Sequence, residues 1–105
     1  MHKLMTKAIE ARFAKVGRDE ETPLEERAIV AKFFNPNGAG TWYALEYDPE
    51  TRRFFGWVAE LGCDELGYFS LDELQNFRGR FGLPIERDLY FGEHTLGDVF
   101  SKVTS

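Results

Sequence analysis

Glu46 is the sharpest single candidate for chemistry in this sequence. It lies close behind a Trp-Tyr pair, and alternation along an extended strand would place it on one face with Trp42 and Ala44. Burial among rings favours the protonated form of a carboxyl group, which would let Glu46 act as a general base. The alternative, which we favour, is that Glu46 faces water or pairs with a cation on a neighbouring strand. The candidate cations are Lys32, Arg52 and Arg53.

Glu86 and Asp88 form a second candidate, with Arg87 between them. On an extended segment the two carboxylates project to one side and the guanidinium to the other. Paired carboxylates can hold Mg²⁺ or divide the roles of acid and base. The simpler alternative, which we again favour, is a solvated strand edge on which Arg87 reaches Asp64 or Glu65.

Signatures of the common reaction centres are missing. The sequence has no phosphate-binding glycine loop, no serine elbow and no metal-binding pair of histidines. Cys63 is the only cysteine, so paired-cysteine zinc sites and an internal disulfide are excluded, and its acidic neighbours disfavour a thiolate nucleophile. We therefore expect no metal and no cofactor.

Aromatic rings with polar tips are the other notable set: Trp42, Tyr43, Tyr47, Trp57 and Tyr68. Such rings are enriched at protein interfaces, but a small domain also uses large rings to fill its core. We favour the core for Trp57, whereas both interpretations stay open for Trp42 and Tyr43. The predicted binding residues are Trp42, Tyr43, Glu46, Tyr68 and Arg87. If the sheet brings Glu46 and the triplet from Glu86 to Asp88 together, these residues would line one groove with Tyr68.

Strands are expected to position these residues. Stretches rich in β-branched and aromatic residues predict consecutive strands at 28–34, 41–47 and 53–59, separated by Pro- and Gly-containing turns. A looser alternation at 85–91 suggests a fourth strand, at an edge or in the centre. Aromatic rings fall on both faces of the second and third strands, so either helices cover both faces or one face awaits a partner.

Helix caps complete the expected fold. Thr6 can cap a first helix that ends at Gly17, Ser70 begins a helix near 70–79, and Thr95 can cap a short closing helix. The predicted class is α+β: a small antiparallel meander of three to four strands with an N-terminal helix, a middle helix and a short C-terminal helix.

Length and charge narrow the choice of partner. A chain of 105 residues fits one domain spanning residues 1–105. Its net charge of -5 disfavours nucleic acid and anionic lipid as partners. No apolar run is long enough for a membrane span and the N-terminus is too polar for a signal peptide, so we expect a cytoplasmic protein.

Four motifs extend over nearly the whole chain. They are Trp-Tyr-Ala-x-Glu-x-Asp after Thr41, Phe-Phe-Gly-x-Val from Phe54, Glu-Leu-Gly-Tyr-Phe-Ser-Leu-x-Glu-Leu from Glu65, and Leu-Pro-Ile-Glu-Arg-Asp-Leu-x-Phe from Leu83. The sequence thereby resembles a family of small bacterial proteins of unknown function, often found on plasmids and other mobile elements. Cys63 departs from the pattern. The resemblance implies no activity and no catalytic residues.

Our leading hypothesis is a non-enzymatic module that binds another protein, since the chain is small, acidic and rich in aromatic residues. The mobile-element setting would suit an accessory role in counter-defence or regulation. The alternative is a small metal-dependent hydrolase or nuclease that uses Glu46, Glu86 and Asp88 around a divalent cation. Direct nucleic-acid binding would need a basic stripe on the first helix.

Overall fold

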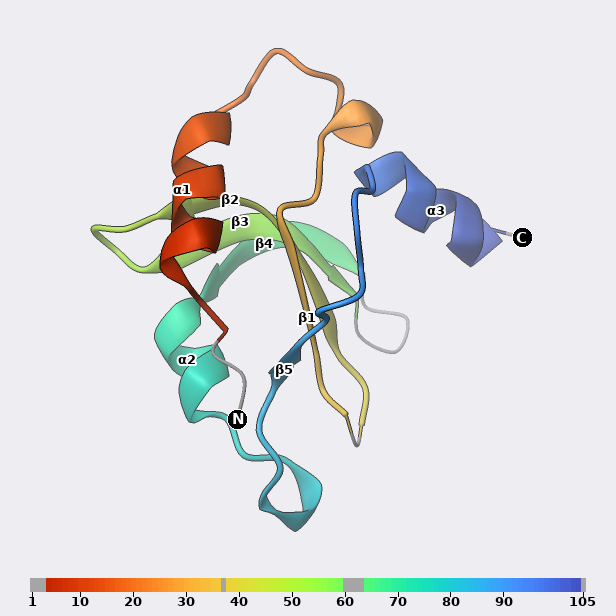
Figure 1. Ribbon diagram of the computed structural model, residues 1–105. Coiled ribbons are helices and arrows are strands. Elements are labelled where there is room, and N and C mark those ends of the chain that lie inside the picture. Colours follow the sequence, from red (N-terminus) through yellow and green to blue (C-terminus); the bar gives the residue numbers. More distant parts are fainter. Residues whose placement is uncertain (1–3, 37, 60–63, 105) are drawn as a thin grey trace.

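A five-stranded antiparallel sheet forms the centre of the fold (Figure 1). The computed structural model describes residues 4–36, 38–59 and 64–104. The strands are β1 (Ala31–Phe34), β2 (Thr41–Asp48), β3 (Arg53–Ala59), β4 (Glu65–Ser70) and β5 (Glu86–Arg87), in the spatial order β4-β3-β2-β1-β5. The α+β class and the meander are confirmed, but the sheet has one strand more than the upper limit predicted.

The two strands that differ from the prediction, β4 and β5, lie at the two edges of the sheet. β4 was not predicted, because the apolar run that forms it is short and contains Gly67, a residue that weakens strand propensity. The predicted strand at 85–91 is reduced to the two residues of β5. The chain leaves the sheet there because the Asp88 carboxylate accepts a hydrogen bond of 2.9 Å from the Tyr90 backbone N–H and so closes a turn.

The helices are α1 (Lys7–Val16), η1 (Leu24–Glu26), α2 (Leu71–Asn76), η2 (Arg80–Gly82) and α3 (Leu96–Thr104). The caps are as predicted: the Thr6 hydroxyl accepts from the Ile9 N–H, and the Ser70 hydroxyl accepts from the Glu73 N–H. α2 is shorter than the expected 70–79, since Phe77 already has extended backbone angles. None of the helices in the described part of the chain is long and apolar enough to cross a bilayer.

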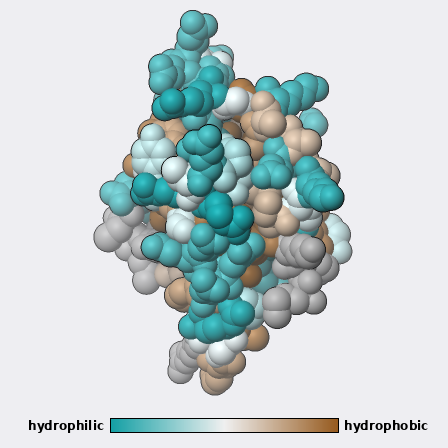
Figure 2. All heavy atoms as spheres, turned by 90° about the vertical axis from the view of Figure 1, so that its left-hand side faces the viewer, coloured by the Kyte–Doolittle hydropathy of each residue, from teal (hydrophilic) through white to brown (hydrophobic). Residues whose placement is uncertain are grey.

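Helices pack on both faces of the sheet, as the first of the two predicted arrangements states, but Leu66 and Tyr68 of β4 stay exposed. On the first face, α1 and α2 pack over a cluster that includes Phe13, Phe33 and Phe54 (Figure 1). On the second face, α3 and η1 pack over a smaller cluster around Leu45 and Leu96. The side of the molecule that lies on the left in Figure 1 carries hydrophilic surface interspersed with smaller hydrophobic areas (Figure 2).

A β-bulge in β2 changes which residues share a face. Ala44 pairs with Gly56 and Glu46 pairs with Phe55, so Leu45 is an extra residue in β2. Leu45 and Glu46 therefore both lie on the second face, while Tyr47 packs with the first cluster. The prediction that Glu46 shares a face with Trp42 and Ala44 is wrong, because simple alternation does not survive the bulge.

Candidate binding groove

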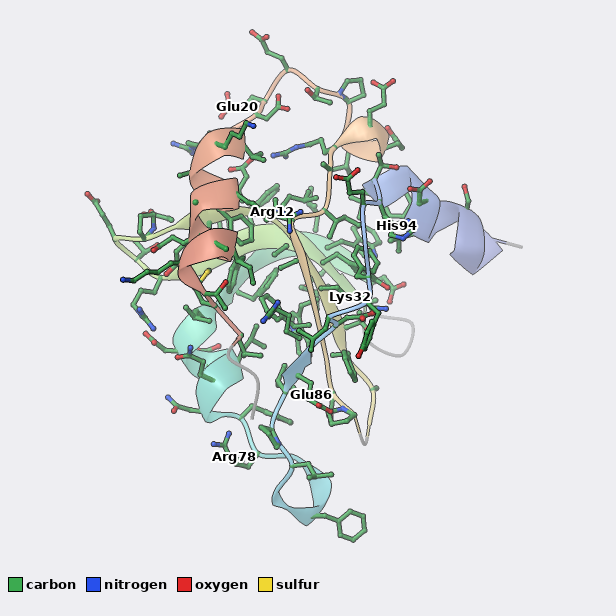
Figure 3. The ribbon with its side chains drawn as sticks, in the orientation of Figure 1. Arg12, Glu20, Lys32, Arg78, Glu86 and His94 are labelled. Atoms are coloured by element: carbon green, nitrogen blue, oxygen red, sulfur yellow. The ribbon has the colours of Figure 1, made fainter. Side chains whose placement is uncertain are left out.

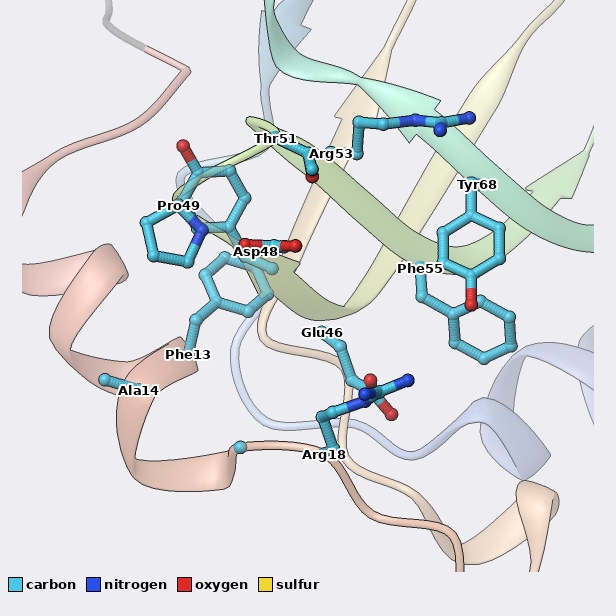
Figure 4. A pocket seen from close by; sticks show the side chains of 12 residues that line it. Phe13, Ala14, Arg18, Glu46, Asp48, Pro49, Thr51, Arg53, Phe55 and Tyr68 are labelled. Atoms are coloured by element: carbon cyan, nitrogen blue, oxygen red, sulfur yellow. The ribbon is translucent and has the colours of Figure 1, made fainter.

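A groove of about 520 Å³ lies between the end of α1, the β2–β3 hairpin and β4 (Figure 4). Its lining includes Phe13, Arg18, Glu46, Pro49, Phe55 and Tyr68. A smaller hollow of about 240 Å³ adds Leu24, Arg27 and Leu66, and shares Arg18, Glu46, Phe55 and Tyr68 with the first. We call the two together the Tyr68 groove.

The floor of the Tyr68 groove holds an ion pair between Arg27 and Glu46. Glu46 also accepts a hydrogen bond of 3.4 Å from the backbone N–H of Asp19. A charge removed from water is costly unless it is paired, and these contacts provide the pairing. Glu46 thus pairs with a cation, as the favoured alternative stated, but the cation is Arg27 and none of the three candidates.

Two aromatic rings lie side by side between two cations along the wall of the groove. The Arg27 guanidinium lies 6.0 Å from the centre of the Phe55 ring, Phe55 and Tyr68 have ring centres 5.1 Å apart, and the Arg53 guanidinium lies 5.6 Å from the Tyr68 ring. Cations over ring faces are attracted to them. Tyr68 is nevertheless 62% exposed and Leu66 39% exposed, so the wall presents apolar area to solvent.

One tyrosine of the lining faces the first cluster. The Tyr47 ring lies 4.9 Å from Phe54 and 5.8 Å from Phe13, measured between ring centres. Burial raises the pKa of the Tyr47 phenol above its ordinary value of 10.0.

The three predicted catalytic carboxylates are not brought together. Glu86 lies on β5, and β1 separates that strand from β2, which carries Glu46 (Figure 3). Asp88 pairs with Lys32 at 3.5 Å. Among the described residues, no group of three or more His, Cys, Asp or Glu side chains is placed to hold a metal ion. Cys63 lies outside the described residues.

The five predicted binding residues are likewise divided. Glu46 and Tyr68 line the groove together. Trp42 packs against the core of the first face, and Tyr43 lies on the second face beside Phe91, at 6.1 Å between ring centres. Burial, with smaller contributions from Asp64 and Asp88, raises the pKa of the Tyr43 phenol. Arg87 borders a separate hollow at the β5 edge.

Sequence reasoning missed Arg27 and assigned Phe55 no binding role. Arg27 directly precedes the apolar run that begins the first strand, and it is buried. A lone arginine next to a buried strand needs an acidic partner, and that signal was available. Gly56 inside β3 was a second signal, because a glycine within a strand often marks a bulge.

The fold and the groove define an α+β domain with a solvent-accessible, aromatic-walled groove and an ion pair at its floor. Residues 4–103 match the family described as "Protein of unknown function (DUF2958)", and the chain belongs to this family. The predicted resemblance to a family of unknown function is thereby confirmed. Comparison with curated proteins and with solved structures gave no significant match.

Proposed function

We propose that this protein is a binding module that engages another protein through the Tyr68 groove. The observation that carries the proposal is the exposure of Tyr68 and Leu66 beside Phe55, on a part of the second face next to the Arg27–Glu46 pair. Tyrosine combines a large apolar ring with a polar tip and loses little rotamer freedom on binding, which makes it an effective interface residue.

The charge pair supports binding over catalysis. Glu46 is held by Arg27 and by a backbone N–H, so its carboxylate is already occupied by structural partners. A metal-dependent hydrolase is the weaker proposal, because the carboxylates it needs lie on strands that β1 separates. The net charge of -5 continues to disfavour nucleic acid as the partner. An accessory role on mobile elements remains a proposal that rests on the family resemblance.

A peptide selection with two matched tyrosine variants tests the proposal. A randomised peptide library displayed on phage is selected against wild type, Tyr68→Ser and Tyr90→Ser. Tyr90 is 94% exposed and follows β5 at the opposite edge of the sheet, so it controls for loss of any exposed tyrosine. We expect wild type and Tyr90→Ser to enrich the same peptides, and Tyr68→Ser to bind them about tenfold or more weakly.

Two results would overturn the proposal. One is a selection that enriches no peptide against wild type. The other is a set of peptides that bind Tyr68→Ser and wild type equally well. Thermal unfolding of all three proteins shows whether each variant is folded, and only folded variants enter the comparison.

A further inference from the structure

β4 is an edge strand without the usual protection. It pairs with β3 over its whole length, from Arg53 opposite Ser70 to Val58 opposite Glu65, without a break in register. Natural edge strands are commonly blunted by shortness, proline, lysine or a bulge. β5, at the other edge, is protected by having two residues. β4 has six residues, no proline, no lysine and no bulge.

The outer backbone of β4 can accept another strand. In an antiparallel pair, half of the N–H and C=O groups of an edge strand point away from its neighbour. In the described part of the chain, β4 is the last strand of the sheet, and no further strand lies beyond it. A Cβ atom added at Gly67 would meet no atom within 4 Å, so the sheet face above this residue is open.

The side chains of β4 would continue into an added strand. Leu66 and Tyr68 lie two residues apart on the groove side of β4 and pair with Trp57 and Phe55 of β3. Side chains alternate along a strand, so every second side chain of an added strand would extend this apolar row. The Tyr68 groove and the β4 edge therefore form one continuous surface.

The charge around this surface favours a basic occupant. The sequence from Phe54 to Phe77 contains no Lys or Arg. The segment between α1 and β1, part of which lines the smaller hollow, carries five acidic residues against Arg18 and Arg27. The acidic side chains at the two ends of β4 and in that segment outnumber the nearby arginines Arg18, Arg27, Arg52 and Arg53; they are Asp64, Glu65, Asp72, Glu73, Asp19, Glu20, Glu21, Glu25 and Glu26. A second copy of β4 would bring like charges together, which disfavours self-pairing.

We infer that β4 accepts an extended segment of another protein as a sixth strand, with apolar side chains over the Tyr68 groove and Lys or Arg residues on either side of them. This inference rests on the proposed binding function and specifies its geometry. Main-chain hydrogen bonds to an edge strand give affinity, and pockets for alternate side chains give specificity.

Backbone methylation of the bound peptide tests the geometry. The probe is the tightest peptide from the selection described above, made in two forms with N-methyl groups on alternate residues in one register or the other. Only one register of a strand faces β4, so one form should lose about tenfold in affinity and the other little. Hydrogen exchange should slow at amides of β4 when the unmodified peptide binds.

Charge-reversed variants test the basic character. The recovered peptides should be enriched in Lys and Arg, and Glu65→Lys should bind them about threefold or more weakly at low salt, with a smaller deficit at high salt. Glu93→Lys, an exposed position far along the chain after β5, is the matched control and should bind as wild type does.

The outcomes separate the two proposals. A selection without any enriched peptide would defeat the groove itself. Peptides that bind through Tyr68 but tolerate methylation in both registers, or that are acidic, would leave the groove standing and overturn strand addition. A dimer of the free protein in sedimentation equilibrium, with β4 amides already protected, would show that the occupant is a second copy and would also overturn the inference.

Discussion

The guanidinium of Arg27 and the carboxylate of Glu46 form an ion pair that joins the segment before β1 to the bulged part of β2. Their side chains are 9% and 18% exposed. The bulge at Leu45 is what places Glu46 on the face where Arg27 can reach it. This ion pair lies at the floor of the Tyr68 groove. Glu46 also binds the segment after α1, because its carboxylate accepts a hydrogen bond from the backbone N–H of Asp19.

Removing one partner of this ion pair should lower the free energy of unfolding strongly, whereas replacing both partners by apolar residues should lower it much less. Arg27→Met leaves the Glu46 carboxylate without its cation, and we expect the free energy of unfolding to fall by about 3 kcal/mol. The double variant Arg27→Met/Glu46→Leu removes both charges and should recover at least half of that loss. Urea denaturation of the single and double variants measures both values. Equal stability of Arg27→Met and wild type would show that the pair is unimportant.

The paired glycines of β3 and β4 should respond in opposite ways to the same substitution. Gly56 and Gly67 face each other across the two strands. A Cβ atom at Gly56 would overlap the Tyr43 carbonyl oxygen, so Gly56→Ala should cost about 3 kcal/mol or more. At Gly67 there is free space, and Gly67→Ala should change stability by less than about 1 kcal/mol. Chemical denaturation of the two variants in parallel provides the comparison.

Replacement of Gly97 in α3 by alanine should destabilise the protein, although alanine has the higher helix propensity. Alanine in a helix interior is usually about 1 kcal/mol better than glycine. A Cβ atom at Gly97, however, would lie 2.8 Å from the carbonyl oxygen of Glu25, which is backbone of η1. Gly97→Ala should therefore lower the thermal midpoint. A raised midpoint would mean that α3 can move away from η1 without loss.

The cap of α3 should make stability sensitive to acid. The Thr95 backbone N–H donates to the Asp98 carboxylate at 2.9 Å, and this bond is the main reason that the pKa of Asp98 lies below its ordinary 3.8. His94 Nδ1, at 3.6 Å, adds to the effect. Because the native state lowers this pKa, the contribution of Asp98 is fully present above 3.8 and is lost as pH falls through the lowered value.

The corresponding experiment compares wild type with Asp98→Asn. The variant should be less stable at neutral pH, where the charged carboxylate acts. The difference should shrink as the pH is lowered below about 3.8, since the wild-type carboxylate then becomes neutral as well. Urea denaturation across the acid range follows the difference, and a gap that stays constant would contradict the assignment.

Local signals predicted the fold well, and the failures concern pairing between strands. Caps at Thr6 and Ser70 depend on a few adjacent residues, so the sequence suffices to predict them. The bulge at Leu45 depends on how two strands fit together, which periodicity within one strand cannot reveal. The one extra residue of the bulge places Glu46 on the face opposite to the predicted one, so the predicted site does not form there. Tyr68 and Glu46 were predicted as binding residues, but Arg27 and Phe55, which lie beside them in the groove, were not.

The pairing of Phe34 with Glu86 has a consequence for the newborn polypeptide. The ribosome makes β1 long before β5, and at typical rates of synthesis the interval is roughly three to ten seconds. α3 is made later still, so for that time the outer side of β1 and much of the second face lack their cover. The nascent chain is therefore most prone to aggregation just before its final quarter is translated.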